Sequence, residues 1–175
     1  MSDIKFNDHY LEGFAKWKQN GFDMRAVILP DEYSDGKDYL GKYESVKRHV
    51  SLPGGRRVVE KPDSQGRYLL YGCGRGWDHY WFTPDSDDEY GLQNAKRMFE
   101  WLNDEWSYVG VKVTASLDGV VLGENSLWGV ESDSNEHGGD EDYFAEVAGD
   151  CAYEAIHEAK TRAAVLLEKL KEVVA

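Results

Sequence analysis

The 175-residue sequence predicts an α+β fold, with an antiparallel sheet, helices packed on one face of it and a long C-terminal helix. Two observations support this class. Short segments of β-type residues are joined by Gly- and Pro-containing turns that are too short for parallel crossovers. Apolar residues recur at helical spacing over residues 85–102 and, for much longer, over residues 142–174. We expect one domain over residues 1–175, with a neutral N-terminal part over 1–60 and an acidic α+β core over 61–175.

The first 60 residues are predicted to hold one helix and three strands. HYLEGFAKWKQ has apolar residues at helical spacing, so we expect a helix that ends at Asn20-Gly21. A buried strand follows over residues 24–29. The pattern over 38–52 fits a helix or a strand, and we favour a strand at its end, paired across Pro53-Gly54-Gly55 with RRVVEK.

The middle of the chain is predicted to form two strands followed by one helix. After a turn over 61–66, RYLLYG and GWDHYWF are predicted to be aromatic strands. Thr83-Pro84-Asp85 combines a capping residue, a first-turn proline and an acidic cluster, which predicts a helix N-terminus. The buried face of that helix would carry Leu92, Ala95, Met98, Phe99 and Leu102.

The last 70 residues are predicted to form a hairpin and one long helix. Strand residues 106–115 turn at Leu117-Asp118-Gly119 into a returning strand, with a bulge expected over 123–126 and a resumption at LWGVE. The helix over 142–174 has small residues in the middle of its apolar stripe, which suits close packing on a sheet. Gly149 is a weak point where this helix could bend or begin again.

The net charge of −13 is concentrated in one part of the sequence. Residues 1–60 carry ten acidic and ten basic side chains, whereas residues 101–175 carry sixteen acidic and five basic ones. Such a charge disfavours direct binding to nucleic acid or to an anionic membrane, because both are polyanions. A negative surface would attract a basic protein partner, and the alternative interpretation is a solvated Glu-rich surface.

The cysteines and the apolar runs indicate a cytoplasmic protein without a membrane span. Cys73 and Cys151 show no metal-binding spacing, so we expect two reduced thiols. The N-terminal residues do not resemble a signal peptide, and the longest apolar runs are far below the ~20 residues that a membrane helix needs.

No motif predicts a catalytic, cofactor or metal site. The loop over 133–144 begins like a calcium loop, but its twelfth position is Phe144 where a bidentate Glu is required. DSDDEY over 85–90 fails the same comparison, the five histidines lack zinc-ligand spacing, and the glycines over 72–76 do not form a phosphate-binding motif. An enzyme would need a site assembled around Cys73, His79 and Glu131.

Clustered aromatic residues and C-terminal carboxylates together form the candidate interaction surface. The strand over 77–82 is aromatic on both faces, so one face is core and the other is either packed or exposed as a binding patch. The candidate residues are Trp77, Trp81, Trp128, Glu131, Asp140, Glu141, Asp142, Glu146, Asp150, Glu154 and Glu158.

Two segments of the hairpin, Trp106-x-Tyr108-Val-Gly-Val-x-Val and Ser126-Leu127-Trp128-Gly129-Val130-Glu131, carry a resemblance to known sequences. Together with the acidic turn, Tyr143 and the Ala/Glu-rich helix that follow, the chain here resembles a group of small uncharacterised proteins encoded by bacteriophages and related mobile elements. The resemblance covers roughly the C-terminal 70 residues. It implies a phage or prophage accessory protein in bacterial cytoplasm and brings no catalytic residues.

These observations predict a non-enzymatic accessory protein that binds a host or phage protein. In its sharper form, the acidic surface mimics DNA and inhibits a nucleic-acid-binding defence complex. One alternative is the enzyme described above. The other is a structural or assembly protein that self-associates, for instance as a homodimer, through the long helix.

Overall fold

A computed structural model describes residues 4–6, 13–46, 55–74, 78–85, 90–134 and 143–174 of the chain. The residues form two compact units, each described below by itself. The terminal unit comprises Met1–Glu32 and Tyr108–Ala175, and the inserted unit comprises Tyr33–Ser107. The chain is thus divided at residues 32 and 107 and not at the expected residue 60. Each unit combines an antiparallel sheet with a helix, which gives the α+β class that the sequence predicts.

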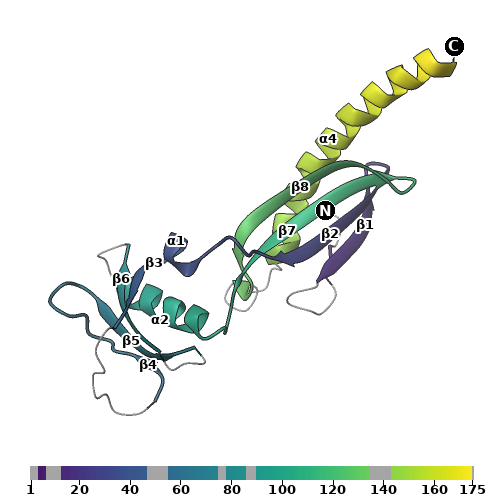
Figure 1. The fold of residues 1–175 in the computed structure, drawn as a ribbon. Helices are drawn as coiled ribbons and strands as arrows, with labels where there is room; N and C mark the ends of the chain where they lie inside the picture. Colours follow the sequence, from purple (N-terminus) through teal and green to yellow (C-terminus); the bar gives the residue numbers. More distant parts are fainter. Residues whose placement is uncertain are drawn as a thin grey trace. The chain divides into compact units, whose positions relative to one another are not determined.

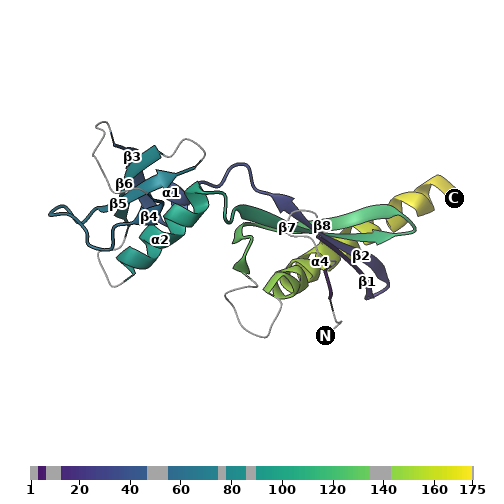
Figure 2. The same ribbon diagram turned by 90° about the horizontal axis from the view of Figure 1, so that it is seen from below.

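The terminal unit is a four-stranded antiparallel sheet covered by one long helix (Figures 1 and 2). The strand order is β1-β2-β7-β8. The elements are β1 Phe14–Gln19, β2 Phe22–Pro30, β7 Tyr108–Leu117, β8 Val120–Glu131 and the helix α4 Tyr143–Val174. The predictions of β2, of the β7-β8 hairpin and of α4 are confirmed.

The prediction of a helix in the segment HYLEGFAKWKQ is wrong for the described residues of that segment. Residues 14–19 form the strand β1 instead. Its burial alternates, with Ala15 buried between the exposed Phe14 and Lys16, and it pairs with β2 in register. Asn20 and Gly21 have φ values of 52° and 85°. Two consecutive positive φ values are typical of a tight β-hairpin turn, so Asn20-Gly21 reverses the chain between strands and does not end a helix.

The core of the terminal unit lies between α4 and one face of its sheet. It consists of alternate residues of the strands, among them Met24, Ala26, Val111 and Val113, and of the near face of α4. Ala155 and Ala159 of α4 lie against Gly123 of β8, where a Cβ atom would collide with the carbonyl oxygen of Ala155. The expected small-residue stripe therefore serves close approach between helix and strand.

Two details of the terminal unit differ from the sequence prediction. The α4 helix runs through Gly149 as one continuous element. The irregularities of β8 lie on either side of residues 123–126, because the register shifts between Ala115 and Ser116 and between Val109 and Val111, while residues 123–126 pair regularly. The second irregularity places Gly129 at a φ of 75°. Trp128, in the same irregular stretch, packs over Gly110 of β7, where a Cβ would collide with the indole ring.

The inserted unit has its own four-stranded antiparallel sheet, in the order β3-β6-β5-β4, and a helix, α2 (Figure 2). Its elements are the one-turn helix α1 Gly36–Tyr39, β3 Gly41–Ser45, β4 Arg57–Val58, β5 Tyr68–Cys73, β6 Asp78–Pro84 and α2 Gly91–Leu102. The two aromatic strands are confirmed as β5 and β6. Because two sheets are present, the prediction of a single sheet is corrected.

One prediction within the inserted unit is wrong, and another lies largely outside the described residues. Arg57 and Val58 form β4 and pair with Tyr71 and Leu70 of β5. The strand expected to pair with them across Pro53-Gly54-Gly55 falls mostly on residues 47–54, which lie outside the described part of the chain. Thr83 and Pro84 do not open a helix, since they end β6 and pair with Lys42 and Gly41 of β3. The helix begins at Gly91. Its buried Ala95 and Met98 agree with the predicted face.

Candidate functional site

Four carboxylates of α4 form a row that we call the acidic row: Glu146, Asp150, Glu154 and Glu158. They follow one another at every fourth residue, so neighbours are separated by about 6 Å along the helix axis and lie on adjoining faces. All four are exposed. Residues 143–159 contain no Lys or Arg, and carboxylates at this spacing repel each other by about 0.2–0.5 kcal/mol per pair. The row therefore costs helix stability and concentrates negative potential.

One member of the row also holds α4 to the sheet. The Glu158 side-chain oxygen Oε2 accepts a hydrogen bond from the backbone N–H of Glu124 in β8, at 2.8 Å. Among the described strands β8 lies at the edge of its sheet, so this bond satisfies a backbone donor on the side away from β7. The Glu124 carboxylate in turn pairs with Lys112 of β7 at 2.9 Å.

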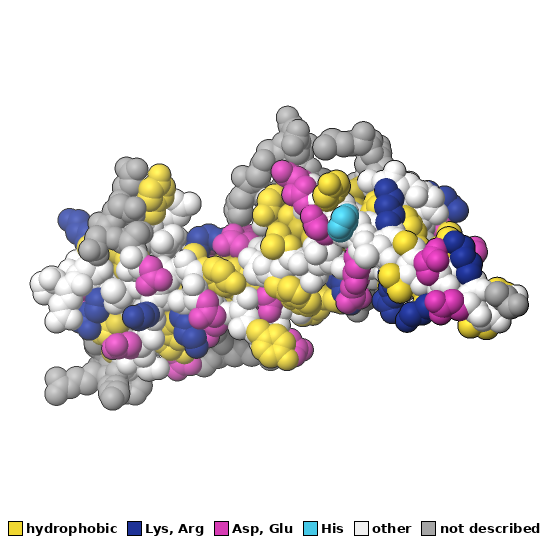
Figure 3. Space-filling model, turned by 90° about the horizontal axis from the view of Figure 1, so that it is seen from above, with side chains coloured by type: hydrophobic (Ala, Val, Ile, Leu, Met, Phe, Trp, Pro, Cys, Tyr) yellow, Lys and Arg dark blue, Asp and Glu magenta, His cyan; other side chains and the backbone are white. Residues whose placement is uncertain are grey.

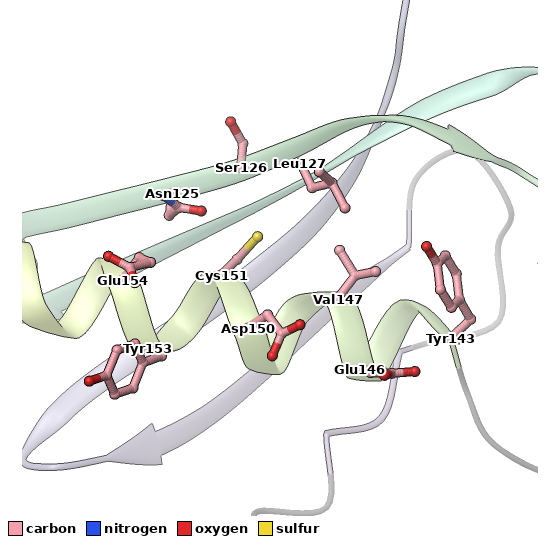
Figure 4. Close-up of a pocket in the computed structure, with 10 residues that line it drawn as sticks. All are labelled: Asn125, Ser126, Leu127, Tyr143, Glu146, Val147, Asp150, Cys151, Tyr153 and Glu154. Carbon is pink, nitrogen blue, oxygen red and sulfur yellow. The ribbon is translucent and has the colours of Figure 1, made fainter. Parts of the chain in front are cut away.

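A groove of about 530 Å³ lies between β8 and the first turns of α4 (Figure 4). Val147 and Cys151 point from the helix toward β8 and form its buried floor. Tyr143, Tyr153 and Leu127 are exposed at its rim. The complete lining that the structure describes is Asn125, Ser126, Leu127, Tyr143, Glu146, Val147, Asp150, Cys151, Tyr153 and Glu154.

The groove combines an apolar floor with a negative rim. Glu146, Asp150 and Glu154 of the acidic row belong to its lining, and no Lys or Arg is among the described lining residues. Burial raises the pKa of the Cys151 thiol, so the floor is uncharged at neutral pH. On the face of the molecule in Figure 3, acidic side chains adjoin hydrophobic ones. This arrangement suits an apolar ligand surface flanked by cations.

Residues 125–127 and Tyr143, Val147 and Tyr153 are site residues that sequence reasoning missed. The four-residue spacing of the acidic row is visible in the sequence, and it places Val147 and Tyr153 next to the row on the same helix. Nothing local predicts which part of β8 lies beside them, because that contact joins residues far apart in the sequence.

Trp128 and Glu131 lie on β8 but outside the groove lining. The indole N–H of Trp128 donates to the Ser126 hydroxyl at 3.0 Å, and the ring is 46% exposed. The backbone N–H of Gly129 donates to the Asp31 carboxylate at 3.0 Å. Glu131 is half-buried at the end of β8, opposite Tyr108. These residues fix the end of the β7-β8 hairpin and leave one face of Trp128 open.

Trp81, the aromatic candidate of the inserted unit that the structure describes, packs against a neighbouring side chain. Trp81 is half-buried on β6, with the Arg67 guanidinium 4.8 Å from its ring centre. Arg67 also pairs with Asp63 at 2.7 Å, and this bond lowers the pKa of the Asp63 carboxyl. Trp77, Asp140, Glu141 and Asp142 lie outside the described residues.

The residues around which an enzyme site was expected are divided between the two units. Cys73 is 1% exposed, and burial, followed by the Asp78 carboxylate, raises the pKa of its thiol to about 12. A cysteine nucleophile needs the thiolate form, which this environment suppresses. His79 stands opposite Tyr71 in the neighbouring strand, and its Nδ1 is buried without a hydrogen-bond partner among the described residues. Glu131 belongs to the other unit.

Neither a metal-binding cluster nor a membrane-spanning helix is found among the described residues. Among them, no group of three or more His, Cys, Asp or Glu side chains is placed to hold a metal ion. Phe144, at the twelfth position of the calcium-like loop, is buried in the core of the terminal unit, while residues 135–142 lie outside the description. No helix in the described ranges is both long enough and apolar enough to cross a bilayer.

No model of a known protein family matches the chain, and no match is found among curated proteins or solved structures.

Proposed function

We propose that the protein is a non-enzymatic binding module whose partner is a basic protein surface. The observation that carries this proposal is the acidic row along an apolar groove between β8 and α4. A partner helix with an apolar stripe would cover Leu127 and Val147, and cations beside that stripe would meet Asp150 and Glu154. Such a contact gains from apolar burial and from charge attraction together.

The setting that we propose is a phage or mobile-element accessory protein acting on a host or phage complex in bacterial cytoplasm. Support comes from the hairpin motif that ends in Ser126–Glu131, by resemblance to proteins of that origin. For the DNA-mimicking version, the acidic row offers one charge per ~6 Å of helix, against one per ~3.4 Å along a DNA strand. A DNA-mimicking surface would therefore need further carboxylates beside the row, and Glu141 and Asp142 precede it in the sequence.

The test uses a synthetic amphipathic helical peptide with a leucine stripe flanked by lysines, labelled for fluorescence anisotropy. We expect the variant Asp150→Lys with Glu154→Lys to weaken its binding at least about tenfold, because two attractions become repulsions, each worth about 1 kcal/mol or more. The matched control, Glu60→Lys with Glu105→Lys, changes the net charge equally but involves exposed residues of the inserted unit, outside the groove lining.

The dependence of binding on ionic strength is a second readout. Raising the ionic strength from about 0.05 to 0.5 M should weaken binding to the native protein, because screening shortens the range of the attraction. Binding of equal strength to native protein, groove variant and control would exclude the acidic row as the binding surface. Binding that persists undiminished at high salt would exclude the electrostatic mechanism.

A further inference from the structure

The last part of α4, residues 160–174, forms what we call the α4 tail. Its apolar side chains are between 40% and 84% exposed: Val165, Leu166, Leu167, Leu170, Val173 and Val174. The core of the terminal unit ends at Ala159, with Ala163 packed at its margin. In Figure 1 the yellow end of α4 extends past the strands. A helix of this length without a covered face is marginal in water, so the stripe favours a partner.

Cations flank this apolar stripe on both sides. By helical position, Lys160 and Lys171 lie on one side of Leu166 and Leu170, and Arg162 and Lys169 on the other. The two carboxylates of the tail, Glu168 and Glu172, lie on the opposite side of the helix, and Glu168 pairs with Lys171 at 2.8 Å. Although the chain has a net charge of −13, the surface around the stripe is positive.

The tail has the properties that the groove requires of a ligand. The stripe offers Leu166 and Leu170 to the apolar floor at Val147 and Cys151. The flanking cations match the carboxylates at the rim. Packing of one tail against another would instead bring the cationic flanks together, so contact with the groove is electrostatically preferred over contact between tails.

A molecule cannot place its tail in its own groove. Both belong to α4, which is one continuous helix from Tyr143 to Val174, so their midpoints are held about 27 Å apart at the helical rise. The occupant from this sequence must therefore be a second copy. In addition, Asp150 and Leu170 are separated by about 200° around the helix, so the groove and the stripe face different sides. Two copies cannot satisfy both surfaces reciprocally, and the association runs head to tail.

We propose that the α4 tail of one copy binds in the β8-α4 groove of the next, giving a head-to-tail self-association. The inference rests on the proposed function, because it names an occupant of the same groove. It makes the groove a site with two competing occupants, the tail of another copy and the basic partner protein. Binding of the partner would then release copies from the assembly.

The experiment measures the mass of the full chain in solution by sedimentation or light scattering. We expect the native chain to exceed the monomer mass of 19.9 kDa increasingly with concentration, and less so at high salt. The groove variant, Asp150→Lys with Glu154→Lys, and the tail variant, Arg162→Glu with Lys169→Glu, should each remain monomeric. A mixture of the two should associate again, because each then offers a surface complementary to the other.

A control and a folding check complete the design. Lys61→Glu with Lys96→Glu changes two exposed cations of the inserted unit and should associate like the native chain. Circular dichroism of both variants shows whether they fold, and restored association in the mixture itself requires folded surfaces. A native chain that stays monomeric, or a groove variant that still associates, overturns the inference.

The two proposals fail separately. If the native chain is monomeric but binds the lysine-rich peptide through the acidic row, the self-association is excluded and the proposed function stands. If the charge-exchanged variants associate with each other but the native groove does not bind the peptide, the self-association stands and the general preference for basic helices is excluded.

Discussion

Gly123 is the residue on which the contact between α4 and the sheet of the terminal unit depends. The backbone of α4 passes so close to β8 that a Cβ at this position would meet the Ala155 carbonyl oxygen and, at 2.6 Å, the Ala159 nitrogen. Both contacts are with backbone atoms, which cannot move without shifting the helix. Gly149, by contrast, has no atom within 4 Å of a hypothetical Cβ. The two glycines thus offer opposite expectations for the same substitution.

Gly123→Ala should lower the free energy of unfolding by about 2–3 kcal/mol, because α4 must move away from β8. Gly149→Ala should raise it by about 0.5–1 kcal/mol, since alanine is the better helix former in an open position. Urea denaturation followed by circular dichroism measures both. Similar effects of the two substitutions would contradict the close packing at Gly123.

The raised pKa of the buried Cys73 thiol predicts that the free energy of unfolding falls in alkaline solution. Burial raises the pKa of this thiol to about 12 in the folded protein, from 9.0 for a thiol exposed to water. Between pH 9 and 12 the unfolded chain therefore loses a proton that the folded chain keeps, and the free energy of unfolding falls, by at most about 1.4 kcal/mol per pH unit. Denaturation of native protein and of Cys73→Ala at pH 8 and pH 10 should show a smaller decline for the variant. Equal declines would contradict the raised pKa.

At the scale of elements, α4 has two halves with different roles. The half up to Ala159 contributes eight buried residues, from Phe144 to Ala159, to the core. The α4 tail adds none, and its net charge is positive where that of the first half is negative. The two halves can therefore be separated by truncation.

Ending the chain after Ala163 should leave the free energy of unfolding within about 1 kcal/mol of the native value, because no fully buried side chain is lost. Ending it after Ala155 removes the buried Ile156 and Ala159 and the hydrogen bond that the Glu124 N–H donates to Glu158, and should cost more than about 3 kcal/mol. Urea denaturation compares the two. A strong loss in the longer truncation would show that the tail packs within its own molecule.

At the scale of the whole molecule, the inserted unit interrupts a strand pair of the terminal unit. β2 and β7 are neighbours in the sheet, and Pro30 pairs with Val109 at their ends. The backbone N–H of Asp31 donates to the carbonyl of Tyr108 at 3.0 Å, so the chain leaves and re-enters the terminal unit at adjacent points. Of the residues of 33–107 that the structure describes, none belongs to the core cluster of the terminal unit. We therefore expect the terminal unit to fold without the inserted residues.

Replacing residues 33–107 by a short Asn-Gly-containing turn should yield a folded terminal unit with a cooperative thermal transition, because such turns connect neighbouring antiparallel strands. The dispersion of amide resonances in NMR spectra checks this. The shortened chain should also bind the lysine-rich peptide through the acidic row. A disordered product would contradict the independence of the two cores.

Local patterns in the sequence suffice to predict the α+β class, the strands β2, β5, β6, β7 and β8, the long α4 and the spacing of the acidic row. Each of these depends on local alternation, turn residues or helical periodicity. Local information could not decide β1: Phe14 and Trp17 have helical spacing, Ala15 and Trp17 have the spacing of one strand face, and Asn20-Gly21 fits a helix end or a hairpin. Pairing with β2 decided it.

Local patterns do not predict the order β1-β2-β7-β8 around an insertion or the groove between β8 and α4, which are visible only in the folded chain. Both depend on contacts between residues far apart in the chain, such as Met24 with Ala115 and Glu124 with Glu158. The exposure of Leu166 and Leu170 follows from where the sheet ends, which their own periodicity does not reveal. Burial is a property of neighbours in space, so the sequence predicted which side chains share a face but not what covers that face.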